Sequence, residues 1–210
     1  MSKRIITIGR QCGSGGHTIG KTLSERLGIP FYDKEIIELA AKESGLSEDF
    51  IENNGEHASG SMLYNLVKNL SYYSNMRSES YYSLQDEVYF CQTRIIKELG
   101  EKDPCVIVGR CADSILDERN DVLNVFIHAD TDYRVQRCVE RSETSRDEAQ
   151  AYIATKDKRR ANHYKYYTEK NWGHSSNYHL CLDSGMLGIE KCVSIIEDIY
   201  LEGDDSNTIL

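Results

Sequence analysis

The sequence has little proline, no long apolar run and no excess of positive charge. Only two of its 210 residues are proline, so few segments are barred from helices and a helix-rich globular protein is expected. No run of eighteen apolar residues occurs and no charged-then-apolar leader opens the chain, which argues against membrane insertion and secretion. We therefore predict a cytoplasmic location. The formal net charge of −9 leaves no broad basic face, which argues against nucleic-acid binding.

Paired cysteine motifs are absent as well. The chain has seven cysteines, an odd number, and no two stand in a C-x-x-C arrangement. Several lie in apolar runs such as "PCVIVG" and "HLCLD", so we expect free thiols in a reducing compartment. Cys12, which lies in a glycine-rich loop, leaves a redox role open. The six histidines show no H-x-H or H-E-x-x-H spacing, so the sequence assigns them no metal.

Short apolar runs predict the strands of a buried sheet. The longest lack alternation, as expected for strands covered on both faces. The predicted strands are residues 5–8, 30–32, 105–108, 122–127 and 178–182. Helical periodicity lies between them, over residues 19–27, over residues 84–99 with Gly100 closing the helix, and over residues 189–200. Alternating strands and helices predict one α/β domain with a parallel sheet.

Three segments depart from this alternation within the single domain of residues 1–210. Residues 47–90 are polar and tyrosine-rich and are predicted to be a helical or mobile insertion over the substrate site. Residues 144–176 form a charged, tyrosine-containing run, predicted to be helical. The acidic end, residues 202–210, is predicted to be disordered.

The first predicted strand leads into the loop "GRQCGSGGHT", which precedes a helix. Successive backbone N–H groups and the positive end of a helix favour an anion, and glycines allow it to approach closely. A phosphate-binding loop of the G-x-x-x-x-G-K-[ST] kind has a lysine after its last glycine, and this loop has none. The sequence therefore predicts a phosphate site with an unusual source of positive charge.

Four segments in order carry a resemblance to one family. "GSGGHTIGKTLSERLGIPFYD" is similar, without a gap, to the opening GSGKGT-x-A-x-x-LAERLG-x-x-YLD of bacterial cytidylate kinases. "VIVGRC" resembles their V-x-x-GRD, "VFIHADTDYRVQR" their strand and arginine-bearing helix, and "LDSGMLGIEKCV" their closing strand and helix. The chain thus resembles the cytidylate kinase-like group over most of its length, residues 47–83 excepted.

This resemblance implies a three-layer P-loop fold of the nucleoside monophosphate kinase type. It implies a five-stranded parallel sheet with helices on both faces and a helical lid at residues 144–176. ATP and Mg²⁺ would be the cofactors, and a small nucleotide would be the acceptor. The oligomeric state stays open, with a homodimer among the alternatives.

The resemblance also assigns roles to residues. The acceptor would be bound by Asp33 and Arg110, and Thr18 would place its hydroxyl on magnesium. Asp157, Arg159 and Arg160 would belong to the lid, with the two arginines in catalytic roles. The donor nucleotide would be bound by Gly13, Ser14, Gly15, Gly16, His17, Thr18, Arg137 and Arg141.

Each assignment has a structural alternative. Asp33 precedes a helix and could be its N-cap. The helix arginines, 137 and 141, could lie on a solvated face, and the lid charges could be ordinary surface charges. His17 could point to solvent.

The sequence departs from the family pattern at positions that would carry charge in phosphoryl transfer. Gly16 stands at the lysine position, Arg10 replaces the first glycine of the loop, and Cys111 replaces the acid of "GRD". Losing one preorganised charge-stabilising group typically slows such chemistry about 10²- to 10³-fold. We expect Arg10 or a lid arginine to replace the lysine, rather than Lys21 on the following helix.

Two classes of function therefore remain. The first is an ATP-dependent phosphotransferase acting on a nucleoside monophosphate, or on another small hydroxyl compound. The second is a nucleotide-binding regulatory module without turnover, which the missing lysine favours.

Overall fold

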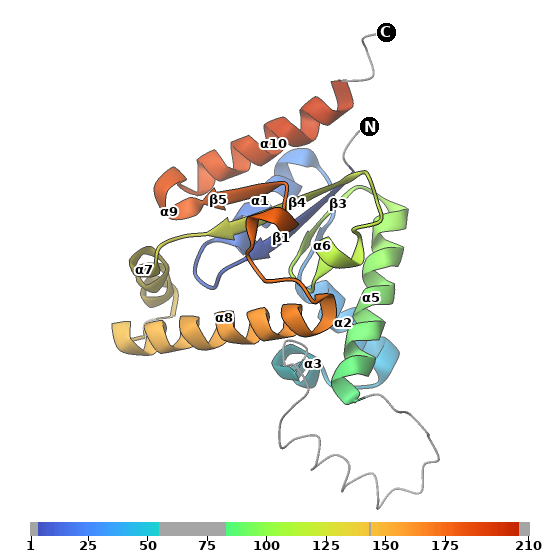
Figure 1. Ribbon diagram of the computed structural model, residues 1–210, viewed down its shortest axis with the longest axis horizontal. Helices are drawn as coiled ribbons and strands as arrows, with labels where there is room; N and C mark the ends of the chain where they lie inside the picture. The colour runs from blue at the N-terminus through green and yellow to red at the C-terminus, as the bar shows by residue number, and fades with distance from the viewer. Residues whose placement is uncertain (1–3, 55–82, 143, 206–210) are drawn as a thin grey trace, which may run out of the picture.

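The computed structural model describes residues 4–54, 83–142 and 144–205 (Figure 1). These residues form a five-stranded sheet of order β2-β3-β1-β4-β5, in which every neighbouring pair is parallel. The strands are β1 (Ile5–Arg10), β2 (Phe31–Tyr32), β3 (Cys105–Val108), β4 (Val122–His128) and β5 (Leu180–Asp183). The predicted parallel sheet is confirmed, with strand boundaries shifted by one or two residues.

Helices connect successive strands. They are α1 (Gly16–Leu27), α2 (Lys34–Ser44), α3 (Glu48–Asn54), α5 (Leu84–Lys102), α6 (Ala112–Ile115), α7 (Thr131–Ser142), α8 (Arg146–Thr168), the 3₁₀ helix η1 (Ser175–Asn177), α9 (Ser184–Leu187) and α10 (Ile189–Asp205). None of the helices described here is long and apolar enough to span a membrane.

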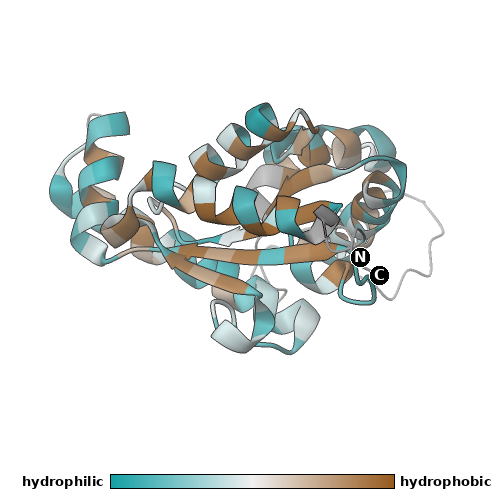
Figure 2. Cartoon of the chain, turned by 90° about the horizontal axis from the view of Figure 1, so that it is seen from above, coloured by the Kyte–Doolittle hydropathy of each residue, from teal (hydrophilic) through white to brown (hydrophobic). Residues whose placement is uncertain are grey.

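Two hydrophobic layers cover the two faces of the sheet, and Figure 2 shows the hydrophobic residues in brown along the strands and on the helices. One face of β1, β3 and β4 packs against α1 and α10, with Ile19, Leu23 and Ile196 fully buried. The other face packs against α2, α5 and α6, with Ile36 and Ile96 at its centre. Continuous apolar strands are stable here because both faces are covered.

The site edge of the sheet is set by topology. Each parallel strand leaves from its carboxyl end into a loop and a helix, so these loops gather along one edge. The long helix α8 passes this edge, beneath the sheet in Figure 1. Residues from β1, the turn after β3 and α8 therefore meet there.

Two sequence expectations about helix ends were wrong. Gly100 does not close α5, which runs on to Lys102. Gly100 is buried, and a Cβ there would lie 3.0 Å from Ile5 Cδ1, so glycine allows the helix to approach β1 closely. At the end of the chain, α10 extends through Asp205, into the segment predicted to be disordered. Each residue that extends an existing helix adds a hydrogen bond, which favours this continuation.

The two predicted insertions are partly described. Within residues 47–90, α3 and the start of α5 are helical, and residues 55–82 lie outside the described part. The predicted lid, residues 144–176, contains the 23-residue helix α8, which begins with a capping box of Ser145 and Glu148.

Candidate active site

The glycine-rich loop joins β1 to α1 in a form suited to an anion. Gly13 and Gly15 have φ of 81° and 84°, a region that L side chains rarely adopt. A Cβ at Gly13 would lie 2.7 Å from the Arg134 carbonyl oxygen, so the position has no room for a side chain. The first amides of α1, at Gly16, His17 and Thr18, lie at the free N-terminal end of the helix, where backbone N–H groups have no partner within the helix, and no side chain caps that end.

Two buried serines fix the conformation of this loop through hydrogen bonds to backbone carbonyl groups. Ser14 is fully buried and its hydroxyl donates to the Gln11 carbonyl at 2.9 Å. The buried Ser184 hydroxyl lies 2.6 Å from the Ser14 carbonyl and 3.1 Å from that of His128. Ser14 can therefore serve a phosphate only through its backbone. The sequence analysis did not select Ser184, because it lies in no motif of the loop. Its role is seen only from its contact with Ser14, which is distant in the sequence.

A buried ion pair ties α7 and α8 to the loop. Asp157 accepts from the Cys12 amide at 2.7 Å and from Arg134 at 2.5 Å, and the Arg134 guanidinium also donates to the Cys12 carbonyl at 3.2 Å. The side chains of Arg134 and Asp157 are 9% and 17% exposed. Asp157 thus holds the glycine-rich loop in place in this structure. Arg134, which the sequence analysis did not select, is its ion-pair partner.

Replacing Asp157 with alanine is expected to destabilise the fold. The change leaves the buried Arg134 guanidinium without its carboxylate, so the free energy of unfolding should fall by about 1.5–3 kcal/mol. Urea unfolding measures this. The matched control is Asp132→Ala, which removes an exposed pair with Arg146 and should leave stability nearly unchanged. Equal effects of the two changes would contradict the assignment.

The lysine position is filled by another side chain. A Cβ at Gly16 would lie 2.5 Å from Arg10 Cβ and 3.0 Å from its Cγ, so the stem of Arg10 covers this glycine. The Arg10 guanidinium reaches on toward Gly109, where a Cβ would overlap it. Arg10 thus excludes a side chain at Gly16 and carries its charge from the loop toward the end of β3. Lys21 is exposed, as a solvent-facing helix residue would be.

Asp33 lies against the end of β1 and the start of α1. Its carboxylate is 3.5 Å from Arg10 Nη2 and 3.6 Å from His17 Nε2. Asp33 occupies the N-cap position of α2, as the structural alternative expects, but its side chain makes no capping hydrogen bond. His17, with 46% of its side chain exposed, faces this carboxylate.

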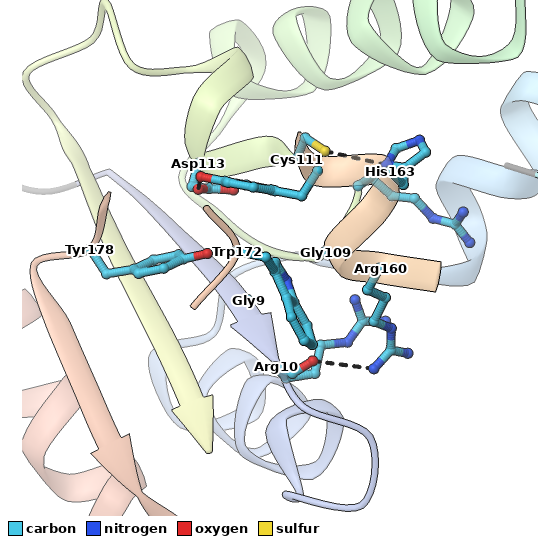
Figure 3. A pocket seen from close by; sticks show the side chains of 11 residues that line it. Gly9, Arg10, Gly109, Cys111, Asp113, Arg160, His163, Trp172 and Tyr178 are labelled. Atoms are coloured by element: carbon cyan, nitrogen blue, oxygen red, sulfur yellow. Dashed lines mark hydrogen bonds between the residues drawn. The ribbon is translucent and has the colours of Figure 1, made fainter. Parts of the chain in front are cut away.

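A cleft open to solvent lies at the ends of β1 and β3 (Figure 3). Arg10, Arg110 and Arg160 line it, from β1, the turn after β3 and α8. Arg110 is 8% exposed, and its Nε and Nη1 have no hydrogen-bond partner among the described residues. Arg160 donates to the Arg10 carbonyl at 3.2 Å. The geometry concentrates positive charge in one recess.

The turn that carries Arg110 is strained. Gly109, Arg110 and Cys111 have successive φ values of 78°, 55° and 55°. A non-glycine residue in this region costs on the order of 1–3 kcal/mol and persists where its surroundings enforce it. Such strain at a buried, unpaired guanidinium is typical of a binding site.

Helix α8 supports this turn through a buried hydrogen bond. Tyr164 donates to Asp113 at 2.6 Å, and both side chains lie on the wall of the cleft. Burial raises the pKa of the Asp113 carboxyl, against the lowering effect of the Tyr164 hydroxyl. Burial, with the neighbouring Asp113 next, also raises the pKa of Tyr164.

The raised pKa of Asp113 predicts a pH-dependent contribution to stability. Between its ordinary pKa of 3.8 and its higher folded value, the folded protein binds more protons than the unfolded chain. This contribution is complete at low pH and is lost as the pH rises through the folded pKa. Asp113→Asn keeps an acceptor for Tyr164 and does not titrate, so the variant should gain stability relative to the parent as pH rises. Urea unfolding from about pH 4 to 8 measures the difference, and a constant difference would contradict it.

The predicted arginines differ in their placement. Arg137 approaches the loop, since a Cβ at Gly15 would lie 3.4 Å from its Nη2. Arg141, farther along α7, is exposed. Arg160 lines the cleft, whereas Arg159 is not among the residues that line it. The structure thus brings Arg10, Arg110 and Arg160 together, with Arg137 on the donor side of the loop.

A glycine loop between the first strand and helix, this strand order and a cleft at the carboxyl ends define the fold of a P-loop kinase. The profile of the cytidylate kinase-like family matches residues 5–186, and the chain belongs to that family. No match was found among curated proteins.

Solved structures agree with the fold. An uncharacterized protein from Eubacterium ventriosum ATCC 27560 is 28% identical with a TM-score of 0.71, over 95% of this chain and 99% of that one. Shikimate kinase from Bacteroides thetaiotaomicron is 14% identical with a TM-score of 0.53, over 93% and 97%. Shikimate kinase from Acinetobacter baumannii, in complex with shikimate, is 13% identical with a TM-score of 0.52, over 95% and 94%.

Proposed function

We propose that this protein transfers the γ-phosphoryl group of Mg-ATP to a small acceptor, most simply a nucleoside monophosphate. The observation that carries the proposal is Arg110, a buried guanidinium with unpaired N–H groups in a cleft beside the glycine loop. A planar guanidinium fork suits a phosphate or carboxylate. The fold of the family supplies the donor side, and the cleft supplies the acceptor side.

The residues of the loop fit the donor phosphates. Gly13 and Gly15 keep side chains away from the approach, and the amides at the start of α1 can donate to phosphate oxygens. Mg²⁺ usually keeps several waters and takes one or two protein ligands beside phosphate oxygens, so the Thr18 hydroxyl fits as such a ligand. Arg137 would hold the nucleotide from α7. When bound, Mg-ATP provides the transferable phosphoryl group.

On the acceptor side, Arg110 would hold the anionic group of the acceptor. Asp33, placed between Arg10 and His17, would orient the attacking oxygen and accept its hydrogen bond. Arg10 and Arg160 would stabilise the charge that develops between donor and acceptor, which is the main task of the protein in phosphoryl transfer. Arg10 would thereby do from β1 what a loop lysine does elsewhere.

A second candidate is a nucleotide-binding module without turnover. It is favoured by Gly16, where the stem of Arg10 leaves no room for a lysine. In that case the loop would bind ATP, and the cleft would sense an anion without receiving a phosphoryl group.

The test is ADP formation from Mg-ATP with a panel of nucleoside monophosphates, CMP included, and a second panel of small anionic hydroxyl compounds. Acceptor-dependent ADP formation supports the kinase. ATP binding by calorimetry with no turnover on either panel supports the binding module and refutes the kinase. Turnover only on the second panel keeps the phosphotransferase and replaces the acceptor.

A further inference from the structure

A thiol and an imidazole meet in the wall of the cleft. Cys111 Sγ lies 3.5 Å from His163 Nδ1, and the two residues are 6% and 5% exposed. Figure 3 shows the contact between the turn after β3 and α8, with both residues lining the cleft. An imidazole in contact with a thiol can take its proton, and the thiolate is the reactive form of cysteine.

The charges around this pair favour a negative sulfur. Arg10, Arg110 and Arg160 line the same cleft, and two N–H groups of Arg110 are unpaired among the described residues. Asp113 opposes this, but burial raises the pKa of its carboxyl and its Oδ2 accepts from Tyr164. Among the residues that line the cleft, arginines therefore outnumber carboxylates.

The other cysteines lack this setting. All seven lie in the described part of the chain, and among the hydrogen bonds given for it Cys111 is the cysteine that pairs with an imidazole. Burial raises the pKa of Cys12, Cys91 and Cys105 to about 11, which keeps them as thiols at neutral pH. Cys181 is the exposed one, and burial of its sulfur still raises its pKa.

We propose that Cys111 is a site of reversible oxidation by hydrogen peroxide, and that the resulting sulfenic acid closes the cleft to its anionic ligand. The thiolate attacks one peroxide oxygen, so an S–O bond forms and the O–O bond breaks. Sulfur is oxidised by two electrons and the peroxide is reduced. The leaving hydroxide takes the proton from the His163 imidazolium and departs as water. The new oxygen stands in the cleft, where the Arg110 N–H groups can donate to it.

The first experiment measures oxidation of the cysteines directly and does not depend on enzymatic activity. The full chain is treated with hydrogen peroxide, and catalase then removes the remaining peroxide. The protein is unfolded in the presence of dimedone, which labels sulfenic acids, and the adducts are mapped by peptide mass spectrometry. We expect adduct formation at Cys111 about tenfold above that at exposed Cys181, because the His163 imidazole can take the proton of Cys111 and the thiolate is the reactive form. Adducts on Cys181 or Cys138 ahead of Cys111 would overturn the proposal.

His163→Gln tests the pair directly. Glutamine keeps a polar side chain of similar length but cannot take the proton, so Cys111 labelling should slow about tenfold while labelling elsewhere is unchanged. Thermal unfolding of the variant verifies that it is folded, and Cys111→Ser verifies the assignment of the adduct. Unchanged labelling of Cys111 in folded His163→Gln would refute the role of the imidazole.

Closure of the cleft rests on the proposed function and is measured separately. Peroxide should abolish acceptor-dependent ADP formation, dithiothreitol should restore it, and the activity of Cys111→Ser should resist peroxide. A Cys111 adduct without loss of activity would refute closure. Absence of ADP formation in untreated protein would refute the kinase and leave the labelling result valid.

Discussion

Replacing Arg110 with alanine is expected to lower acceptor-dependent ADP formation about 10²- to 10³-fold, the usual effect of removing one preorganised donor. The guanidinium is 8% exposed, and its Nε and Nη1 have no partner within the described chain. These two buried nitrogens thus have hydrogen-bonding capacity that the described residues do not use. The loss should fall mainly on KM for the acceptor, since Arg110 lines the acceptor cleft rather than the glycine loop.

Two variants sharpen this test. Arg110→Lys keeps the charge and loses the planar fork, so it should recover only part of the activity. Arg119→Ala removes an arginine whose partner is Asp121 and which lies outside the lining of the cleft, so it should leave kinetics unchanged. An Arg110→Ala protein with normal KM and kcat would remove the main support for the acceptor site.

Introducing the lysine of the G-x-x-x-x-G-K-[ST] loop motif through Gly16→Lys is expected to damage the protein. The new Cβ would overlap the stem of Arg10 at 2.5 Å, and such overpacking costs about 1–3 kcal/mol. We expect a lower midpoint in urea unfolding and no gain in ADP formation. A fully stable Gly16→Lys protein with faster turnover would show that the stem of Arg10 does not exclude the lysine.

A double variant separates crowding from chemistry. Arg10→Gly removes the overlapping stem, so Arg10→Gly/Gly16→Lys should be more stable than the sum of the single changes predicts. Recovery of ADP formation in the double variant, beyond that of Arg10→Gly alone, would mean that the two cations serve one role. No coupling in stability would contradict the contact itself.

Local patterns were sufficient for the sheet. Apolar runs without alternation predicted the five strands, because strands buried on both faces need such runs, and helical periodicity predicted α1, α5 and α10. The glycines of the loop were likewise readable, since few other functions require Gly13 and Gly15 together. Arg110 could be selected because it matches the arginine of the resembling GRD motif, and an arginine that follows a buried strand and a glycine is unusual.

Contacts between distant segments could not be predicted. Whether a charged helix residue is buried depends on what packs against it, and so Arg134 was missed while exposed Arg141 was chosen. The same holds for Asp157, whose carboxylate meets an amide 145 residues away. Gly100 has the usual signature of a helix end, and only the proximity of Ile5 explains it.

Helix α8 has a further consequence for ligand binding. This one helix contacts the glycine loop through Asp157 and contacts α6, which follows the turn that carries Arg110, through Tyr164. Any shift of the helix therefore alters the donor and acceptor elements in the same event. By thermodynamic reciprocity, whatever factor ATP imposes on affinity for the acceptor, the acceptor must impose on affinity for ATP. On the proposed function, ATP and the acceptor would therefore both act on the position of α8, in the same or in opposite directions, without contacting the same end of the helix.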